Sequence, residues 1–205
     1  MFMSFRVKFS IMIIVLGGML VFLPSIQNKI NEPKLSELFE VSTISNIYFS
    51  VDQIAKSMVR EDTSILLIDL RSPEEYKAFN LPGSINIPYN DLLNRDWQGY
   101  LNQKSIKNVL YSNGDFTSTS AWIIVTRLGY ENNFILKGGL NEWYNTVMES
   151  KFEGRKITAK ENALFETRTK AKILFTEMNS LPDSLKVKFI AAKRLKEQQL
   201  DGGCN

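Results

Sequence analysis

The sequence predicts an α/β fold in which a parallel sheet is flanked by helices. Short apolar runs of four or five residues alternate with stretches of helical character. The run at residues 65–68 is continuously apolar and is bounded by charged residues. This pattern is typical of a strand that is buried on both faces, as the strands of parallel sheets are.

The expected elements follow one another between residues 46 and 150. We expect strands at 46–50, 65–68, 84–87, 108–111 and 133–136, and helices at 51–59, from Ser72 onward, at 117–128 and at 140–149. Ser72 suits a helix N-cap, because Pro73 and two acidic residues follow it. Gly129 suits the position just after a helix end. Function in such a sheet usually lies at the carboxyl ends of the strands.

The composition excludes several kinds of active site. The 205 residues include no His and one Cys, Cys204. Without His there is no Ser-His-Asp triad, no Cys-His pair, no His-ligated zinc and no imidazole base. A single Cys excludes an intramolecular disulfide and a paired-cysteine metal or redox site. We therefore expect no metal and no cofactor.

Residues 1–28 are expected to form a signal anchor or transmembrane helix. Arg6 and Lys8 precede an uncharged stretch at residues 9–28, which as a helix reaches about 30 Å, the thickness of a bilayer core. The small-residue pattern of a cleavage site is incomplete around Ser25, which favours an uncleaved anchor over a removed signal peptide. Residues 29–44 are expected to be a linker. The flanking charges place the rest of the chain on the extracytoplasmic, periplasmic side, or outside the cell if the segment is cleaved.

Residues 151–205 are expected to form a basic helical extension. They hold 12 Lys and Arg against 7 Asp and Glu, whereas residues 1–150 hold 13 against 15. A capping box from Thr158 to Glu161 begins a helix at 159–178 with an apolar stripe, a second helix is expected at 185–200, and residues 201–205 form a flexible tail with Cys204. These helices could pack on the sheet or on each other, bind a partner protein through residues 155–200, or lie on an anionic membrane. No nucleic-acid recognition motif is present, so no nucleic-acid partner is expected.

Four segments, in this order, resemble those of a rhodanese domain. Residues 68–76 contain Asp69 and Arg71 at a strand end. Residues 81–88 resemble a second family segment, and Asn80, directly before them, stands where the family usually has His. A strand at 109–111 then leads into a loop at 112–117, and residues 136–143 carry the Gly-Gly pair and Trp143. The resemblance covers residues 45–150 and implies a single rhodanese-like domain, which the hydrophobic segment at residues 1–28 is expected to tether to a membrane.

The loop departs from the family at its first residue. In active rhodaneses this residue is a Cys, whose thiolate is stabilised by backbone N–H groups and carries the transferred sulfur as a persulfide. Here the position is Ser112, and a hydroxyl neither ionises near neutral pH nor carries a persulfide. Ser112 could instead be a helix-start hydroxyl that satisfies a backbone donor. The resemblance implies an anion cradle made of Ser112, Asn113, Gly114, Asp115, Phe116 and Thr117, in which Asp115 would repel an anionic donor if it pointed inward.

Two further features are expected to be structural. Asp69 and Arg71 can form a partly buried, bidentate pair that tethers neighbouring loops. Trp143 is expected to be a core anchor rather than a platform for a ligand.

These observations predict a catalytically inactive rhodanese-like module, anchored in a membrane, that binds or scaffolds. The alternative is a sulfurtransferase or sulfur carrier that uses Cys204 or a thiol of a partner. A third hypothesis is a structural accessory subunit of an envelope complex, with the C-terminal helices as its contact surface.

Overall fold

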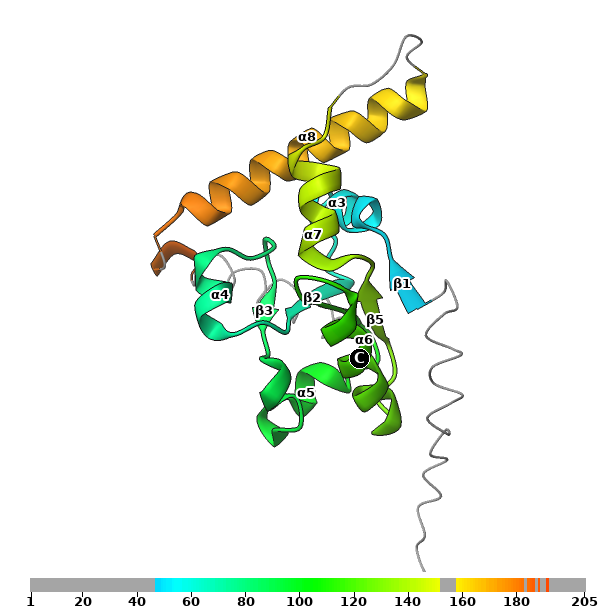
Figure 1. Cartoon of the computed structure of the whole chain (residues 1–205), viewed down its shortest axis with the longest axis vertical. Helices are drawn as coiled ribbons and strands as arrows, with labels where there is room; N and C mark the ends of the chain where they lie inside the picture. The colour runs from blue at the N-terminus through cyan, green and yellow to red at the C-terminus, as the bar shows by residue number, and fades with distance from the viewer. Residues whose placement is uncertain (1–46, 152–157, 183, 187, 189–190, 192–205) are drawn as a thin grey trace, which may run out of the picture. The chain divides into compact units, whose positions relative to one another are not determined.

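The computed structural model describes residues 47–151, 158–182, 184–186, 188 and 191 (Figure 1). All of them belong to one compact unit, Pro33–Asn205. The expected hydrophobic helix at 1–28, the linker at 29–44 and the tail with Cys204 lie outside the described residues. In the part of the chain that is described, no helix is both long and apolar enough to cross a membrane.

Five parallel strands form the sheet, in the order β1-β5-β4-β2-β3. The strands are β1 (Tyr48–Phe49), β2 (Ile65–Asp69), β3 (Ile85–Asn86), β4 (Lys107–Tyr111) and β5 (Asn133–Leu136). The prediction of an α/β fold with a parallel sheet flanked by helices is confirmed. The two edge strands are shorter than expected, since each has two paired residues.

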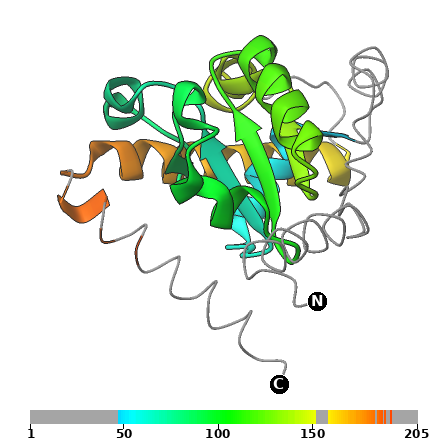
Figure 2. The same cartoon turned by 90° about the horizontal axis from the view of Figure 1, so that it is seen from below.

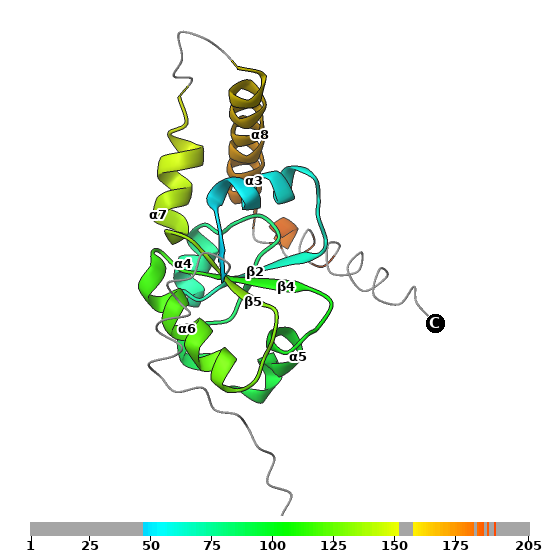
Figure 3. The ribbon, with the colours of Figure 1, turned by 90° about the vertical axis from the view of Figure 1, so that its right-hand side faces the viewer.

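Helices cover both faces of this sheet. One face carries α5 (Gln98–Leu101) and α6 (Asp115–Arg127), and the other carries α3 (Val51–Val59), α7 (Gly139–Trp143) and α8 (Ala159–Ser180). Two views at right angles agree that α8 lies on the opposite side of the sheet from α6 (Figures 2 and 3).

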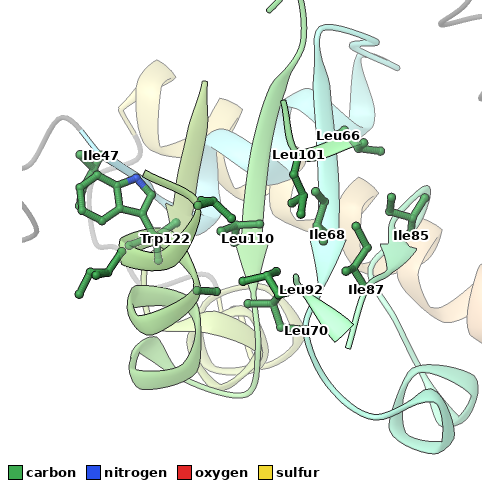
Figure 4. Packing of buried hydrophobic residues seen from close by; sticks show 14 residues of the cluster. Ile47, Leu66, Ile68, Leu70, Ile85, Ile87, Leu92, Leu101, Leu110 and Trp122 are labelled. Atoms are coloured by element: carbon green, nitrogen blue, oxygen red, sulfur yellow. The ribbon is translucent and has the colours of Figure 1, made fainter. Parts of the chain in front are cut away.

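Alternation along β2 divides the core into two clusters. Leu66 and Ile68 pack on the α6 side with Trp122, as Figure 4 shows, whereas Ile65 and Leu67 pack on the α3 side. Each residue of β2 is buried, because successive side chains of a strand point to opposite faces and both faces are covered. Burial on both faces explains why residues 65–68 are continuously apolar in the sequence.

Helix α4 (Pro73–Ala78) begins as the sequence predicts. The Ser72 side chain accepts a hydrogen bond from the Glu75 N–H, and the Glu75 side chain accepts one from the Ser72 N–H. Pro73 occupies the first turn, where its missing N–H costs nothing. No residue of α4 is buried, so contacts at its ends and with neighbouring loops decide where it lies.

Two expected boundaries on the carboxyl side of the sheet are wrong. Helix α6 begins at Asp115 rather than at residue 117, because Gly114 adopts the extended conformation of an N-cap and the Asp115 carboxylate suits a first turn. The helix expected at 140–149 is α7 followed by a π-helical segment, η4 (Tyr144–Met148). Short 3-10 segments, η2 (Tyr89–Asp91) and η3 (Arg95–Trp97), lead into α5.

The first helix of the C-terminal extension packs on the rhodanese-like part of the chain. The expected Thr158 capping box is present, and α8 runs two residues further than predicted. Ala171 and Met178 are buried, and Arg168 forms a bidentate ion pair with Asp52 of α3. Of the second expected helix, the described residues 184–186, 188 and 191 are helical.

Candidate functional site

The candidate site lies where β4 ends, beside the start of α7. Ser112, Asn113 and Gly114 connect β4 to α6. The Leu140 N–H donates to the Ser112 carbonyl over 2.9 Å, and the Asn141 N–H donates to the Asn113 carbonyl over 3.0 Å. The first turn of α7 therefore holds the two carbonyl groups of this connection.

Gly139 permits this close approach. Its φ of +58° is in the left-handed region. A Cβ atom at this position would collide with the Ser112 carbonyl oxygen and would lie 2.9 Å from the Gly114 nitrogen. The Gly-Gly pair seen in the sequence thus sets the shape of the connection between β4 and α6.

Five consecutive backbone N–H groups of this segment have no acceptor in the part of the chain that the structure describes. Among the described residues, none accepts a hydrogen bond from the N–H groups of residues 113–117. Gly114, the N-cap, also has no side chain to cap the helix. Such donors, together with the N-terminal end of the α6 dipole, favour an anion or another hydrogen-bond acceptor.

Ser112 follows a strand residue that is anchored in the core. Tyr111 is completely buried, and its hydroxyl donates to the Ser84 side chain over 2.9 Å and accepts from the Leu81 N–H over 3.2 Å. Burial raises the pKa of Tyr111 well above its ordinary value, so its phenol stays neutral. Tyr111 thereby fixes the end of β4, from which Ser112 extends.

Ser112 is 7% exposed as a residue, and its hydroxyl makes no hydrogen bond with a described residue. Gly114 is the N-cap of α6, so the interpretation of Ser112 as a helix-capping hydroxyl is wrong. No described base accepts a hydrogen bond from this hydroxyl. Proton removal from Ser112 is therefore unassisted in this arrangement.

Carboxylates flank the segment. Asp115 accepts a hydrogen bond from the Gly138 N–H over 2.6 Å, so its charge lies at the start of α7. On the other side, the Asn113 amide donates to Glu75 over 3.1 Å. This hydrogen bond, partly opposed by desolvation and aided by the bonds with Ser72 and the charge of Arg71, lowers the pKa of Glu75. Both carboxylates oppose the binding of a multiply charged anion.

The remaining residues of the expected cradle form the first turn of α6. Phe116 is 86% exposed, whereas Thr117 is half-buried. The segment thus presents an aromatic side chain to solvent beside its unpartnered N–H groups.

Asp69 and Arg71 form the bidentate pair that the sequence predicts. Arg71 donates from Nη2 and Nε to the Asp69 carboxylate, over 2.7 and 3.0 Å, and both side chains are buried. Burial would lower the pKa of Arg71, but the hydrogen bond to Asp69 and its charge raise it. The same Nη2 donates to the Phe79 carbonyl over 2.7 Å. The pair joins the end of β2 to the segment after α4.

Sequence reasoning missed the contacts that link the site to its surroundings. The capping box with Ser72 accounts for one carboxylate oxygen of Glu75, and no sequence pattern indicates that the other oxygen accepts a hydrogen bond from the Asn113 amide. Asn179 of α8 bonds to the backbone of Asn80, 99 positions away, and no local pattern signals such a contact. Cys204 lies outside the described residues, so the structure does not bring it to the site.

The fold and the site together define a class. A five-stranded parallel sheet supports a short connection rich in free N–H donors at the carboxyl end of its central strand, β4. Residues 50–146 match the rhodanese-like domain family. The chain therefore contains a rhodanese-like domain.

The relatives found include sulfurtransferases. The chain is 28% identical over 111 residues to the thiosulfate:glutathione sulfurtransferase of Saccharomyces cerevisiae, a match that covers 49% of this chain and 80% of the yeast protein. It is 29% identical over 102 residues to the adenylyltransferase and sulfurtransferase uba4 of Ogataea parapolymorpha, and the match covers 50% of this chain but 26% of that protein. Among solved structures, the BH2092 protein from Bacillus halodurans aligns with a TM-score of 0.46 and 22% identity, over 63% of this chain and 98% of that one.

Proposed function

We propose that this chain is a rhodanese-like module that binds a ligand or partner and does not itself transfer sulfur at the 112–117 segment. The observation that carries this proposal is that Ser112, not Cys, stands at the end of β4, and that no described base is hydrogen-bonded to its hydroxyl. A sulfurtransferase of this family needs a thiolate at the corresponding position, because the intermediate requires an S–S bond. A hydroxyl cannot form that bond.

Binding capacity does not depend on the missing thiol. The donors of residues 113–117 belong to the backbone, so they remain with Ser as with Cys. Asp115 and Glu75 add negative charge on both sides, which favours a ligand with an uncharged or singly charged acceptor over a dianion such as thiosulfate.

The location and partner of the module belong to the same proposal. Residues 1–28 would anchor the chain in a membrane, and residues 30–205 would face the extracytoplasmic side. Residues 155–200 would contact a partner protein, which the half-exposed Ile173 and Leu174 of α8 support. Co-fractionation of the full chain with membranes before and after carbonate washing would test the anchor.

Sulfur transfer by the full-length chain tests the central claim. The assay supplies thiosulfate or mercaptopyruvate as donor and cyanide or glutathione as acceptor. We expect no turnover by the unmodified chain or by Cys204→Ser, and turnover by Ser112→Cys, because a thiolate there can take the donor's sulfur as a persulfide. Thiosulfate then releases sulfite and mercaptopyruvate releases pyruvate, and the acceptor removes the outer sulfur as thiocyanate or glutathione persulfide. Ser120→Cys is the matched control, since it places a thiol on α6 outside the segment.

Two outcomes would decide against the proposal. Turnover by the unmodified chain that is lost in Cys204→Ser would make the tail thiol catalytic. Turnover that persists in Cys204→Ser without any thiol would show that the reaction needs no cysteine of this chain.

A further inference from the structure

The end of α8 holds a buried piece of backbone in the rhodanese-like domain. The Asn179 side chain accepts from the Asn80 N–H and donates to the Asn80 carbonyl, each over 2.9 Å. The Asn179 amide also donates to the Phe175 carbonyl, over 2.8 Å, which fixes its orientation on the helix. Asn80 is 2% exposed, so water does not replace these bonds if Asn179 is lost.

Aromatic packing connects the Asn179–Asn80 hydrogen bonds, here called the Asn179 clamp, to the buried Arg71–Asp69 ion pair. Phe175, one turn before Asn179, stacks edge-on against Phe79 with ring centroids 6.5 Å apart. The Arg71 guanidinium lies 4.6 Å from the centroid of the Phe79 ring and donates to the Phe79 carbonyl. The Phe79 position is thus determined from two sides, by α8 and by Arg71.

Helix α4 connects the Asn179 clamp to the 112–117 segment. At its C-terminal end, the Asn80 side chain donates to the Tyr76 carbonyl over 2.9 Å. At its N-terminal end, Glu75 accepts the hydrogen bond of the Asn113 amide. No residue of α4 is fully buried. These end contacts, together with the hydrogen bond that the Tyr76 hydroxyl donates to the Ser84 carbonyl over 2.6 Å, therefore determine where Glu75 lies.

We propose that Asn179 is a positioning residue for the 112–117 segment, acting through Asn80 and α4 on the Glu75–Asn113 hydrogen bond. The C-terminal extension would then contribute to the binding site rather than only flank it. This inference rests on the proposed function in one respect, namely that the free N–H groups of residues 113–117 form the binding site.

A thiol at position 112 reports on those N–H groups. In the full-length double variant Ser112→Cys/Cys204→Ser, the single thiol is alkylated with iodoacetamide across a pH series, which measures its pKa. Aligned donors and the α6 dipole should hold this pKa below the value of about 8.5 of a free thiol. Adding Asn179→Ala should raise it toward that value by about 0.5 or more, which lowers the thiolate fraction about threefold at a pH well below both pKa values.

The controls separate positioning from general loss of stability. Asn162→Ala changes the same residue type on the exposed first turn of α8 and should leave the thiol pKa unchanged. Arg168→Met breaks the ion pair that holds α8 to α3 and should lower the thermal midpoint without moving the thiol pKa. Asn179→Gln, which keeps an amide but displaces it, provides a milder second variant if the alanine variant folds poorly.

A double-mutant cycle with Glu75→Ala tests the route. Because that substitution already removes the Asn113 partner, Asn179→Ala should no longer raise the thiol pKa in its presence. The inference is overturned if the parent thiol has an ordinary pKa, if neither Asn179 variant changes it, if Arg168→Met changes it equally, or if the full shift survives in Glu75→Ala. Sulfur transfer by the unmodified chain would refute the proposed function but would leave these results standing.

Discussion

Three ion pairs among the described residues, Arg71–Asp69, Arg168–Asp52 and Lys170–Glu166, should differ in energetic importance although their lengths are nearly equal. Arg71 and Asp69 approach to 2.7 Å with side chains 2% and 0% exposed, and Arg168 and Asp52 also approach to 2.7 Å with side chains 26% and 33% exposed. Because the N–O distances of these two pairs are equal, burial decides how much the free energy of unfolding falls when one partner is removed. Arg71→Met would leave the Asp69 carboxylate buried and unpaired, at a cost of about 3–5 kcal/mol. Total stabilities are typically about 5–15 kcal/mol, so this variant should be close to unfolding.

The other two pairs supply the comparison. Arg168→Met leaves Asp52 accessible to water, and we expect a loss of about 1 kcal/mol. Lys170→Met removes the exposed i,i+4 pair with Glu166, 2.6 Å long, and should leave stability unchanged within error. The expected order of destabilisation is therefore the order of burial.

Urea unfolding followed by far-UV circular dichroism measures these differences, with midpoints compared at constant slope. The double variant Asp69→Leu/Arg71→Met should be more stable than Arg71→Met alone, because no charge is then left buried. The reasoning fails if Arg71→Met costs no more than Arg168→Met, or if the double variant is the less stable of the two.

Two further outcomes follow from the same region. Gly139→Ala should lower the thermal midpoint, at a cost of about 2 kcal/mol or more, because it places a Cβ atom on a left-handed backbone and against the Ser112 carbonyl. Gly99→Ala, at a helical position with open space around it, should not lower the midpoint, and equal effects of the two substitutions would contradict this account. The pKa of Glu75 is lowered in the folded chain, so its contribution to stability is present above its unfolded pKa of about 4.3 and is lost as the pH falls through the folded value. Asn113→Ala should therefore show a weaker loss of stability between about pH 5 and pH 3 than the unmodified chain, measured by urea midpoints, and an unchanged slope against pH would contradict the assignment.

Elements with local signals could be predicted from the sequence. The helix at Val51–Val59 and the strand at Asn133–Leu136 have the predicted bounds, because each has a clear pattern and clear flanking signals. The start of α6 could not be predicted, since Gly114 permits either a loop or an N-cap and the sequence does not distinguish them. The π-helical turn after Trp143 also has no local signature.

The contacts of the candidate site also divide into those with a local sequence signal and those without one. The Asp69–Arg71 pair was predictable because its members are two positions apart at a strand end. The hydrogen bond between Asn113 and Glu75 depends on how two loops meet, and the Asn179–Asn80 contact depends on where α8 packs. A split in net charge at residue 150 indicates a different kind of segment, but it contains no information about such packing.

The geometry separates two properties that a rhodanese-like site normally combines. The free N–H groups of residues 113–117 result from backbone shape, which the close approach of Gly139 and the extended Gly114 impose. Sulfur transfer at this segment would depend instead on one side-chain atom at position 112. Replacing the Ser112 oxygen by sulfur alters that atom and leaves the donors in place. Measurements on Ser112→Cys therefore ask whether the backbone alone can activate a thiol, whereas ligand binding by the unmodified chain asks what the donors recognise when no thiol is present.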